Sequence, residues 1–286
     1  MKRIAYPGVP GSFSEQALTQ YFPGSAKKTN VKQFEEIFTL LANNEIDYGV
    51  LPIENSSTGG IFEVFDFLKQ YNFYIVGETF IHVTHHLLGT SGTTLASIQA
   101  VYSHPQGFGQ SRVFLKQYPH WIETPYYNTA ISAEYVSQVK DITKAAIASK
   151  RAGELYGLDV IQANIQDVNH NYTRFVIISR NLEVKVTDTK ISLLYALPNS
   201  VGALYNSLGI FARYNIDLLN LQSRPIKDKP WECYFYLDLV GNLDKDNVKA
   251  ALLEIEKISY SLQILGSYSA SDDNGGSISS SKKGSS

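Results

Sequence analysis

The sequence predicts an α/β protein made of two units, a larger N-terminal region and a small C-terminal domain. Strand and helix patterns alternate as far as Asn181, which is typical of α/β units with mostly parallel sheets. After Asn181 the order changes to strand–helix–strand–strand–helix–strand, the ferredoxin-like βαββαβ arrangement. The length of 286 residues also favours two units, because one hydrophobic core usually stops growing near about 250–300 residues.

In the N-terminal region, short apolar runs predict strands and amphipathic spacing predicts helices. Ser12 followed by Glu15 is a capping-box pattern, so we expect a helix that ends near Tyr21. Apolar residues at positions i, i+3, i+4 and i+7 predict the next helix, from Phe34 to Leu41. The other expected strands are residues 3–6, 48–51, 100–102 and 145–148, and the other expected helices are 107–118, 128–139 and 150–156.

The C-terminal domain is expected to contain four strands and two helices. The strands are residues 191–197, 216–223, 233–240 and 259–265, and the helices are 201–213 and 245–257. Residues 269–286 are rich in Ser, Gly, Asp and Lys with almost no apolar content, so we expect a disordered tail.

The composition is that of an ordinary globular protein, with 44% hydrophobic and 18% charged residues. A formal net charge of -2 argues against a nucleic-acid surface, which needs clustered Lys and Arg. The N-terminus lacks an apolar signal segment, and no run of about 18 apolar residues occurs. With Cys233 as the single cysteine, no intrachain disulfide forms. We therefore expect no membrane span and a cytoplasmic location.

Four polar loops follow predicted strands, where α/β proteins usually bind ligands. They span residues 53–60, 103–110, 128–130 and 171–175. The first offers hydroxyls, an amide and flexible backbone that suit a carboxylate ligand, although a polar turn with a helix N-cap is the simpler interpretation. Within it, Glu54 lies beside a buried strand and needs a partner or water.

The next two loops carry amides and helix caps. Gln106 and Gln110 share one face of a predicted helix. His104 precedes a proline in a turn, which favours a structural hydrogen bond over proton transfer. Asn128 and Thr129 open a helix, where an N-cap is the simplest interpretation, yet a free helix N-terminus also binds anions.

Three histidines, His82, His85 and His86, lie on a run that resembles a strand. Strand spacing would place His82 and His86 on one face and His85 on the other. A metal would need two or three ligands on one face. We therefore expect core or interface histidines and no metal site.

The fourth loop places Arg174 beside Thr173 at the start of a buried strand. Arg174 can bind a carboxylate through two hydrogen bonds, and Thr173 can supply a hydrogen bond or a proton. The alternative is a surface ion pair next to a β-branched residue. The chain contains no GxGxxG, P-loop or GxSxG motif, so a nucleotide cofactor and a serine hydrolase are unsupported.

Together these segments resemble the successive motifs of the prephenate dehydratase family. In the family's order they are GVPGSFSE (8–15), PIENSSTG (52–59), SHPQ (103–106), NTAISA (128–133), AAIAS (145–149), YGL (156–158) and NYTRF (171–175). GALY (202–205) and LQSRP (221–225) resemble the family's regulatory ACT domain. The resemblance extends over residues 3–267.

The resemblance implies a catalytic domain over residues 1–181, with two lobes like those of type II periplasmic-binding proteins and the active site between them. Lobe one would comprise residues 1–79 and 166–181, lobe two residues 80–165, and the ACT domain residues 190–267. The implied reaction converts prephenate to phenylpyruvate with loss of CO2 and water, without a cofactor, in phenylalanine biosynthesis.

The family's catalytic threonine falls on Thr173, and the resemblance adds Arg174, Asn55 and Glu54 as catalytic residues. The implied substrate contacts are Ser56, Ser103, Gln106, Gln110, Thr129, Ala130, Ser149 and Phe175. Because a neutral threonine is a weak acid, a hydrogen bond that strengthens as the ring hydroxyl leaves is favoured over early proton transfer.

The resemblance also implies L-phenylalanine as effector, bound between two ACT domains of a homodimer or homotetramer. Its implied contacts are Gly202, Ala203, Leu204, Leu221, Gln222 and Ser223. Gln222 replaces the family's usual acidic residue, and Tyr205 and Asp217 also depart from the common pattern, which leaves the strength and sign of regulation open.

Two other functions remain as alternatives. Arogenate dehydratases share the family's fold and recognise an amino group in place of the keto group. A non-catalytic amino-acid sensor is the second, although a degenerate sensor would be expected to lose the threonine that Thr173 retains.

Overall fold

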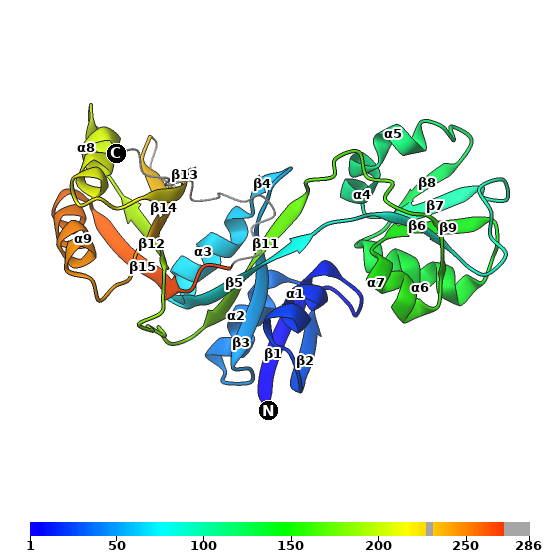
Figure 1. The fold of residues 1–286 in the computed structure, drawn as a ribbon, viewed down its shortest axis with the longest axis horizontal. Helices are drawn as coiled ribbons and strands as arrows, with labels where there is room; N and C mark the ends of the chain where they lie inside the picture. The colour runs from blue at the N-terminus through cyan, green and yellow to red at the C-terminus, as the bar shows by residue number, and fades with distance from the viewer. Residues whose placement is uncertain (227–230, 272–286) are drawn as a thin grey trace, which may run out of the picture.

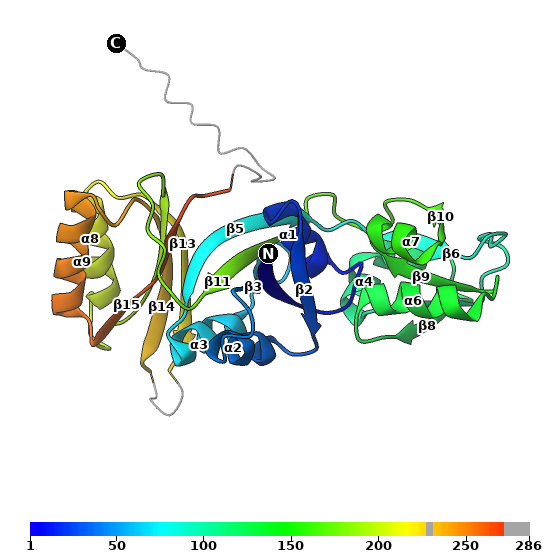
Figure 2. The ribbon, with the colours of Figure 1, turned by 90° about the horizontal axis from the view of Figure 1, so that it is seen from below.

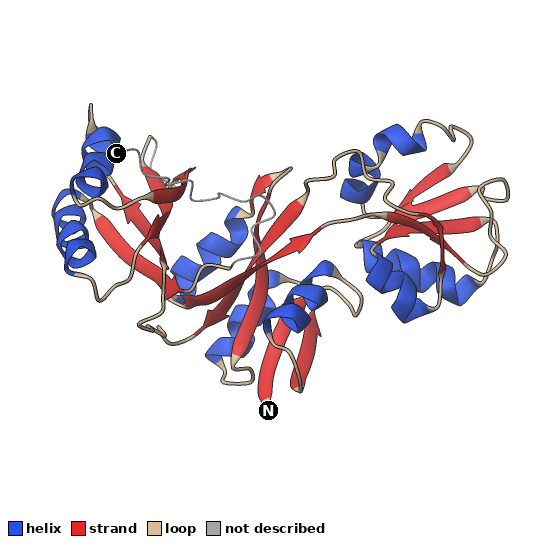
Figure 3. Cartoon of the chain, viewed as in Figure 1, coloured by secondary structure: helices blue, strands red, loops and turns tan. Residues whose placement is uncertain are grey.

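The computed structural model describes residues 1–226 and 231–271. The first group of elements, called lobe one, is a sheet with three helices (Figures 1 and 3). Its elements are β1 (Lys2–Pro7), α1 (Phe13–Tyr21), β2 (Ala26–Val31), α2 (Phe34–Ala42), β3 (Tyr48–Asn55), β4 (Gly59–Gly60), α3 (Phe62–Tyr71), β5 (Tyr74–His82) and β11 (Tyr172–Ser179). As predicted, Ser12 caps α1 by accepting from the backbone N–H of Glu15, and α2 buries Ile37, Phe38 and Leu41.

Lobe two is a separate five-stranded sheet with helices on both faces (Figure 1). Its elements are β6 (His86–Gly89), β7 (Ala100–Ser103), α4 (Pro105–Gln110), α5 (Arg112–Leu115), β8 (Ile122–Pro125), α6 (Thr129–Val139), β9 (Lys144–Ala148), α7 (Lys150–Tyr156) and β10 (Asp159–Gln162). The strand order is β10-β6-β9-β7-β8. Helices α4 and α5 pack on one face, while α6 and α7 pack on the other.

The C-terminal domain has the βαββαβ order that the sequence predicts. Its elements are β12 (Lys190–Ala196), α8 (Ala203–Arg213), β13 (Leu218–Pro225), β14 (Cys233–Val240), α9 (Asp246–Ile258) and β15 (Ser261–Tyr268). The strands lie in the order β13-β14-β12-β15 and are antiparallel, the ferredoxin-like arrangement. Both helices cover the same face (Figure 2).

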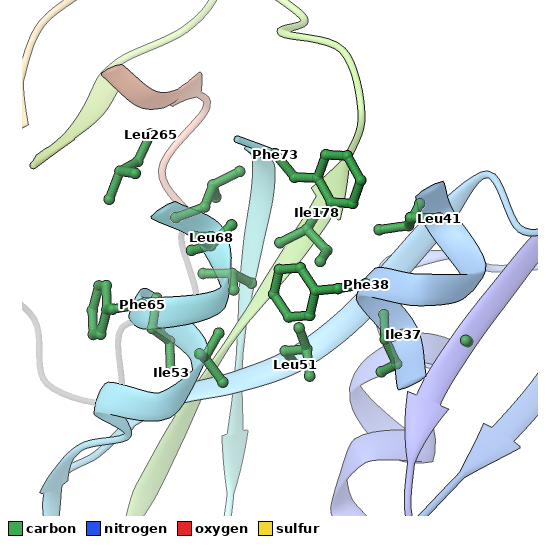
Figure 4. Packing of buried hydrophobic residues seen from close by; sticks show 14 of the residues in the cluster. Ile37, Phe38, Leu41, Leu51, Ile53, Phe65, Leu68, Phe73, Ile178 and Leu265 are labelled. Carbon is green, nitrogen blue, oxygen red and sulfur yellow. The ribbon is translucent and has the colours of Figure 1, made fainter. Parts of the chain in front are cut away.

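The C-terminal domain continues the sheet of lobe one. Strand β15 pairs with β5 at Gly266 and Ile75, so ten strands form one curved sheet (Figure 2). The hydrophobic core also crosses this junction, where Leu265 packs in one cluster with Phe38, Leu68 and other residues of lobe one (Figure 4). This shared core and sheet fix the C-terminal domain against lobe one.

The prediction of mostly parallel sheets was wrong for the larger sheet. Strand β1 runs parallel to β2 and β3, but β11 runs antiparallel to both β3 and β5. The cause is the path of the chain, which leaves lobe one after β5, builds lobe two and returns as β11. An outgoing and a returning strand side by side are necessarily antiparallel.

The predicted single helix over residues 107–118 is two short helices, α4 and α5. The carboxylate of Asp167 accepts hydrogen bonds from the backbone N–H groups of Arg112 at 3.0 Å and Val113 at 2.9 Å. These bonds cap a new helix after Ser111, a tertiary effect that the local pattern does not contain.

Most of the predicted tail, residues 269–286, lies outside the described residues. None of the described helices combines the length and the apolar character that crossing a membrane requires.

Candidate active site

A cavity of about 240 Å³ lies between lobe one and lobe two. Lobe one and its connections contribute Phe13, Asn55, Val83 and Thr173, and lobe two contributes His85, His104, Gln106, Gly107, Gln110, Tyr127, Asn128 and Thr129. The cavity therefore collects side chains from all four polar loops, which are separated in the sequence.

Asn55 and Thr173 are directly opposite each other on β3 and β11. The Nδ2 atom of Asn55 donates to Thr173 Oγ1 at 2.9 Å and to Asn171 Oδ1 at 2.8 Å. The Oδ1 atom of Asn55 accepts from the backbone N–H groups of Ser57 and Thr58, at 2.9 and 3.2 Å. Because those N–H groups can only donate, they fix the orientation of the Asn55 amide.

This orientation decides what the Thr173 hydroxyl can do. Its oxygen accepts from Asn55, and no described residue accepts its hydrogen. A hydroxyl has one donor and two acceptor lone pairs, so the hydrogen remains able to donate to a group in the cavity.

On the opposite wall, His85 Nε2 lies 2.8 Å from Gln110 Oε1. Burial lowers the pKa of His85 below its usual range, against the opposite effect of this hydrogen bond. The neutral ring therefore carries its one N–H on Nε2 and donates to Gln110. The amide nitrogen of Gln110 is left to donate to another acceptor.

The N-terminus of α6 forms a further part of the cavity wall. Asn128 Oδ1 caps it by accepting from the backbone N–H of Ile131 at 2.8 Å, and Thr129 is its first residue. A helix N-terminus favours negative charge nearby. His104 caps α4 in the same way, with Nδ1 accepting from the N–H of Gln106 at 3.1 Å, which agrees with its predicted structural role.

Known proteins resemble this chain over most of its length. The family model for prephenate dehydratase matches residues 4–183. The bifunctional chorismate mutase/prephenate dehydratase of Escherichia coli (strain K12) is 38% identical over 272 residues, which cover 93% of this chain and 70% of that protein. The chain belongs to the prephenate dehydratase family.

Two solved structures share its fold. The prephenate dehydratase of Arthrobacter aurescens, in complex with L-Phe, has a TM-score of 0.84 and 27% identity, covering 93% of this chain and 90% of that one. The structure described as GqqA, a novel type of quorum quenching acylase, has a TM-score of 0.85 and 30% identity, covering 95% of this chain and 99% of that one.

In this member of the prephenate dehydratase family, Arg174 does not line the cavity. Consecutive strand residues point to opposite faces, so Arg174 turns away from the side that Thr173 occupies. Its side chain is buried and bonds Glu78 Oε2 at 2.7 Å, Asp238 Oδ2 at 2.5 Å and Tyr268 Oη at 2.8 Å. Each of the three guanidinium nitrogens of Arg174 therefore has a protein partner, and the structure does not bring this predicted catalytic residue to the cavity with Thr173.

Glu54 is also absent from the cavity wall. It pairs with Arg174 across β3 and β11, and its carboxylate lies 3.8 Å from Arg174 Nη1 and 3.4 Å from Gln222 Nε2. The structure thus places this predicted catalytic residue against the C-terminal domain and not on the cavity wall.

Five predicted substrate contacts support the site from outside the cavity wall. Ser103 Oγ donates to the carbonyl of Ile147 at 2.8 Å, and Ser56 Oγ accepts from the N–H of Tyr172 at 2.9 Å. Ala130 is buried in the core of lobe two and Phe175 in that of lobe one.

Ser149 joins the two lobes. It caps α7 by accepting from the N–H of Ala152 at 3.1 Å, while its hydroxyl donates to the carbonyl of Gly11 at 3.2 Å. Gln16 Nε2, from lobe one, donates to the hydroxyl oxygen of Ser149 at 3.2 Å.

The three histidines do not form the predicted continuous strand. Strand β5 ends at His82, β6 begins at His86, and His85 lies between them and turns to the cavity. His82 stacks on Tyr172, and His86 Nδ1 accepts from the N–H of Asn164 at 3.2 Å. Within residues 1–226 and 231–271, no group of three His, Cys, Asp or Glu side chains could hold a metal ion.

Sequence reasoning did not select His85, Phe13 or Tyr127 as site residues. Phe13 stands in the first family motif, and Tyr127 immediately precedes the motif that begins at Asn128, so both lie in or next to segments that the motifs mark. His85 had no such signal, because its position depends on the break between β5 and β6.

The predicted effector contacts fall on two sides of β13. Leu221 and Ser223 are exposed, whereas the intervening Gln222 faces lobe one, where a Cβ atom added at Gly60 would lie 2.2 Å from Gln222 Oε1. The structure therefore separates Gln222 from the other contacts on β13. Gly202, at a φ of 79°, precedes the first turn of α8, which contains Ala203 and Leu204.

Proposed function

We propose that this chain converts prephenate to phenylpyruvate, CO2 and water in the cavity between the lobes. The main support for this proposal is the geometry of the Thr173 hydroxyl. Its oxygen accepts a hydrogen bond from Asn55, and its hydrogen is left to donate into the cavity. Family membership supplies the substrate and the reaction class, a decarboxylating dehydratase.

The reaction needs one proton at the departing oxygen. As the carboxylate leaves as CO2, its bonding electrons enter the ring, the carbon–oxygen bond to the ring hydroxyl breaks, and the hydroxide takes up a proton to become water. Thr173 donates a hydrogen bond to that oxygen and passes its proton to it as the carbon–oxygen bond breaks, and solvent water then returns a proton to Thr173 Oγ1. Asn55 stabilises the negative charge that develops on Thr173 Oγ1, because its N–H is already directed there.

The rest of the cavity suits a dianion that must lose CO2. The amides of Gln106 and Gln110 and the N-terminus of α6 provide neutral donors for carboxylates. Among the described residues, no Lys or Arg lines this cavity. A cation next to the departing carboxylate would stabilise the charged substrate more than the transition state, in which this group is becoming neutral CO2. Neutral donors avoid this extra stabilisation of the substrate and so keep the barrier lower.

The C-terminal domain is, by this proposal, an ACT domain over residues 190–267 that binds L-phenylalanine. Its βαββαβ order and the L-Phe complex of the relative from Arthrobacter aurescens support this assignment. The exposed Leu219 and Leu221 on β13 provide an apolar edge for a second copy. The catalytic domain of residues 1–181, with two lobes of the type II periplasmic-binding kind, and the cytoplasmic location are parts of the same proposal.

Steady-state kinetics of Thr173→Ala and Thr173→Ser test the proposal. Phenylpyruvate formation from prephenate is followed by absorbance in alkali, with arogenate as a second substrate. We expect Thr173→Ala to lower kcat by about 10²–10³-fold with a smaller change in KM, and Thr173→Ser to retain most of kcat. An undiminished kcat in Thr173→Ala would refute the role of Thr173. If the wild-type protein converted arogenate but not prephenate, arogenate would be its substrate.

The names of the matched family model and of the Escherichia coli relative favour prephenate over arogenate.

A further inference from the structure

Both members of the Asn55–Thr173 pair have a sequence neighbour that contacts the C-terminal domain. Thr173 pairs with Asn55 across β11 and β3, and Arg174 pairs with Glu54 at the next position. Asn55 and Thr173 line the cavity, whereas Arg174 and Glu54 lie toward β13 and β14. Two adjacent residue pairs of β3 and β11 therefore point to opposite sides. Asn55 and Thr173 face the cavity, and Glu54 and Arg174 face the C-terminal domain.

Arg174 belongs to a buried network of charges that crosses the domain junction. Lobe one contributes Arg174 and Glu78, and the C-terminal domain contributes Lys190, Asp238 and Tyr268. Lys190 Nζ lies 2.9 Å from Glu78 Oε2 and 3.7 Å from Asp238 Oδ2. All five side chains are buried. Two cations and two carboxylates thus neutralise one another away from water.

The pKa values of Asp238 and Tyr268 are shifted in this network. Burial alone would raise the pKa of Asp238, but the charges of Arg174 and Lys190 outweigh it, so the pKa of Asp238 lies below its usual value. Burial raises the pKa of Tyr268 well above its usual value, so its hydroxyl stays neutral. Arg174 therefore has a permanent anionic partner in Asp238 and a neutral one in Tyr268.

The pairing of β11 is irregular close to Thr173, as it also is further along, where the pairing with β5 shifts between Ile177 and Ile178. The pairing of β11 with β3 shifts between Arg174 and Phe175, where Arg174 is opposite Glu54 and Phe175 opposite Pro52. A bulge disrupts the hydrogen-bond ladder locally and bends the strand, which can change the direction of a side chain beside it. The hydrogen bonds of the Arg174 side chain to Glu78, Asp238 and Tyr268 hold the backbone of β11 at the residue where its pairing with β3 shifts.

We propose that Asp238 and Tyr268, both in the C-terminal domain, are positioning residues for the reaction. By holding the guanidinium of Arg174, they fix β11 one residue from Thr173 and so place its hydroxyl against the departing oxygen. This inference rests on the proposed role of Thr173. A small displacement of a reacting group lowers the rate strongly, which is why a contact outside the cavity matters.

The test compares Asp238→Asn and Tyr268→Phe with the wild-type full chain. Asp238→Asn keeps the shape but removes the charge, and Tyr268→Phe removes only the oxygen that Arg174 Nη2 contacts. We expect both variants to lower kcat by about 10- to 100-fold while KM for prephenate changes little. Where Asp238→Asn fails to fold, Tyr268→Phe gives the same readout with a smaller perturbation.

Asp66→Asn is the matched control. Asp66 on α3 forms an ion pair with Arg224 on β13, so it also joins lobe one to the C-terminal domain, but the pair is partly exposed and remote from β11 in the sheet. Although β13 also approaches Glu54 through Gln222, Asp66 itself has no bond to Arg174, Asp238 or Tyr268 among the described residues, so we expect this variant to leave kcat unchanged. Wild-type kcat in folded Tyr268→Phe, or an equal loss of kcat in Asp66→Asn, would overturn the proposal.

A double variant separates this inference from the proposed function. If Asp238 acts through Thr173, then Thr173→Ala combined with Asp238→Asn has the kcat of Thr173→Ala alone. If the fold-losses in kcat of the two single variants multiplied in the double variant, the positioning role of Asp238 would be overturned, while the role of Thr173 would stand. An undiminished kcat in Thr173→Ala alone would instead refute the role of Thr173.

Discussion

The Nδ2 atom of Asn55 lies 2.9 Å from Thr173 Oγ1, and Asn55 is the donor of this hydrogen bond. The direction of donation follows from the two backbone N–H groups that occupy Asn55 Oδ1. The pair therefore presents the Thr173 hydrogen to the cavity, and a change in the direction of this one bond alters the chemistry.

Asn55→Asp reverses that direction. An aspartate carboxylate can only accept, so it takes the Thr173 hydrogen that the departing oxygen needs. We expect kcat to fall by about 10²-fold or more, with a smaller change in KM, measured by phenylpyruvate formation. Wild-type kcat in a folded Asn55→Asp variant would contradict the inferred direction of the bond.

Ser149→Ala tests whether Ser149 contacts substrate or supports the lobes. Because Ser149 caps α7 and bonds Gly11, we expect a loss of about 1 kcal/mol in the free energy of unfolding and little change in KM, measured by urea unfolding and kinetics. Ser12→Ala, which removes the cap of α1, is the control for cap loss without a lobe contact. A large rise in KM at unchanged stability would support a direct substrate contact instead.

His85 makes stability depend on pH. Its pKa is lowered by burial in the fold, so below about pH 6.5 the unfolded chain binds the proton first and the free energy of unfolding falls as the pH drops. We expect a smaller slope in His85→Gln between this pH and the lowered pKa, measured by urea unfolding at several pH values. His86 and His104, whose pKa values burial also lowers, contribute with the same sign and leave part of the slope. An identical slope in both proteins would contradict the buried neutral state of His85.

Gly266→Ala tests the junction between β15 and β5. A Cβ atom there would lie 2.1 Å from the carbonyl oxygen of Ile75, which belongs to the backbone and cannot rotate away. We expect a loss of about 1–3 kcal/mol in the free energy of unfolding, measured in urea. The control is Gly209→Ala on α8, where the added atom meets nothing within 4 Å and we expect unchanged or raised stability. An equal free energy of unfolding in Gly266→Ala and Gly209→Ala would contradict the close contact of β15 with β5 at Gly266.

The local patterns predicted much of the secondary structure and part of the site. The capping serine of α1 and the apolar spacing of α2 are local signals, and both helices formed as predicted. The predicted site residues Asn55, Thr173 and Gln110 all reach the cavity. Each belongs to a loop at or near a strand end, and such ends converge on ligand sites in α/β folds.

Side-chain direction limited the rest of the prediction. Thr173 and Arg174 were assigned together to the substrate, although consecutive strand residues point to opposite faces. The same alternation separates Gln222 from Leu221 and Ser223 on β13. In lobe two, the split between α4 and α5 depends on Asp167, which is far away in sequence.

The sequence by itself determined the family motifs and the order of the elements, because these depend on neighbouring residues, and it indicated both Thr173 and Arg174 as site residues. Only the tertiary structure decided which of the two faces the cavity. Lobe two packs near Thr173, and the C-terminal domain places Asp238 and Tyr268 around Arg174. Those contacts join residues distant along the chain, and a buried charge must meet its partners wherever the fold brings them.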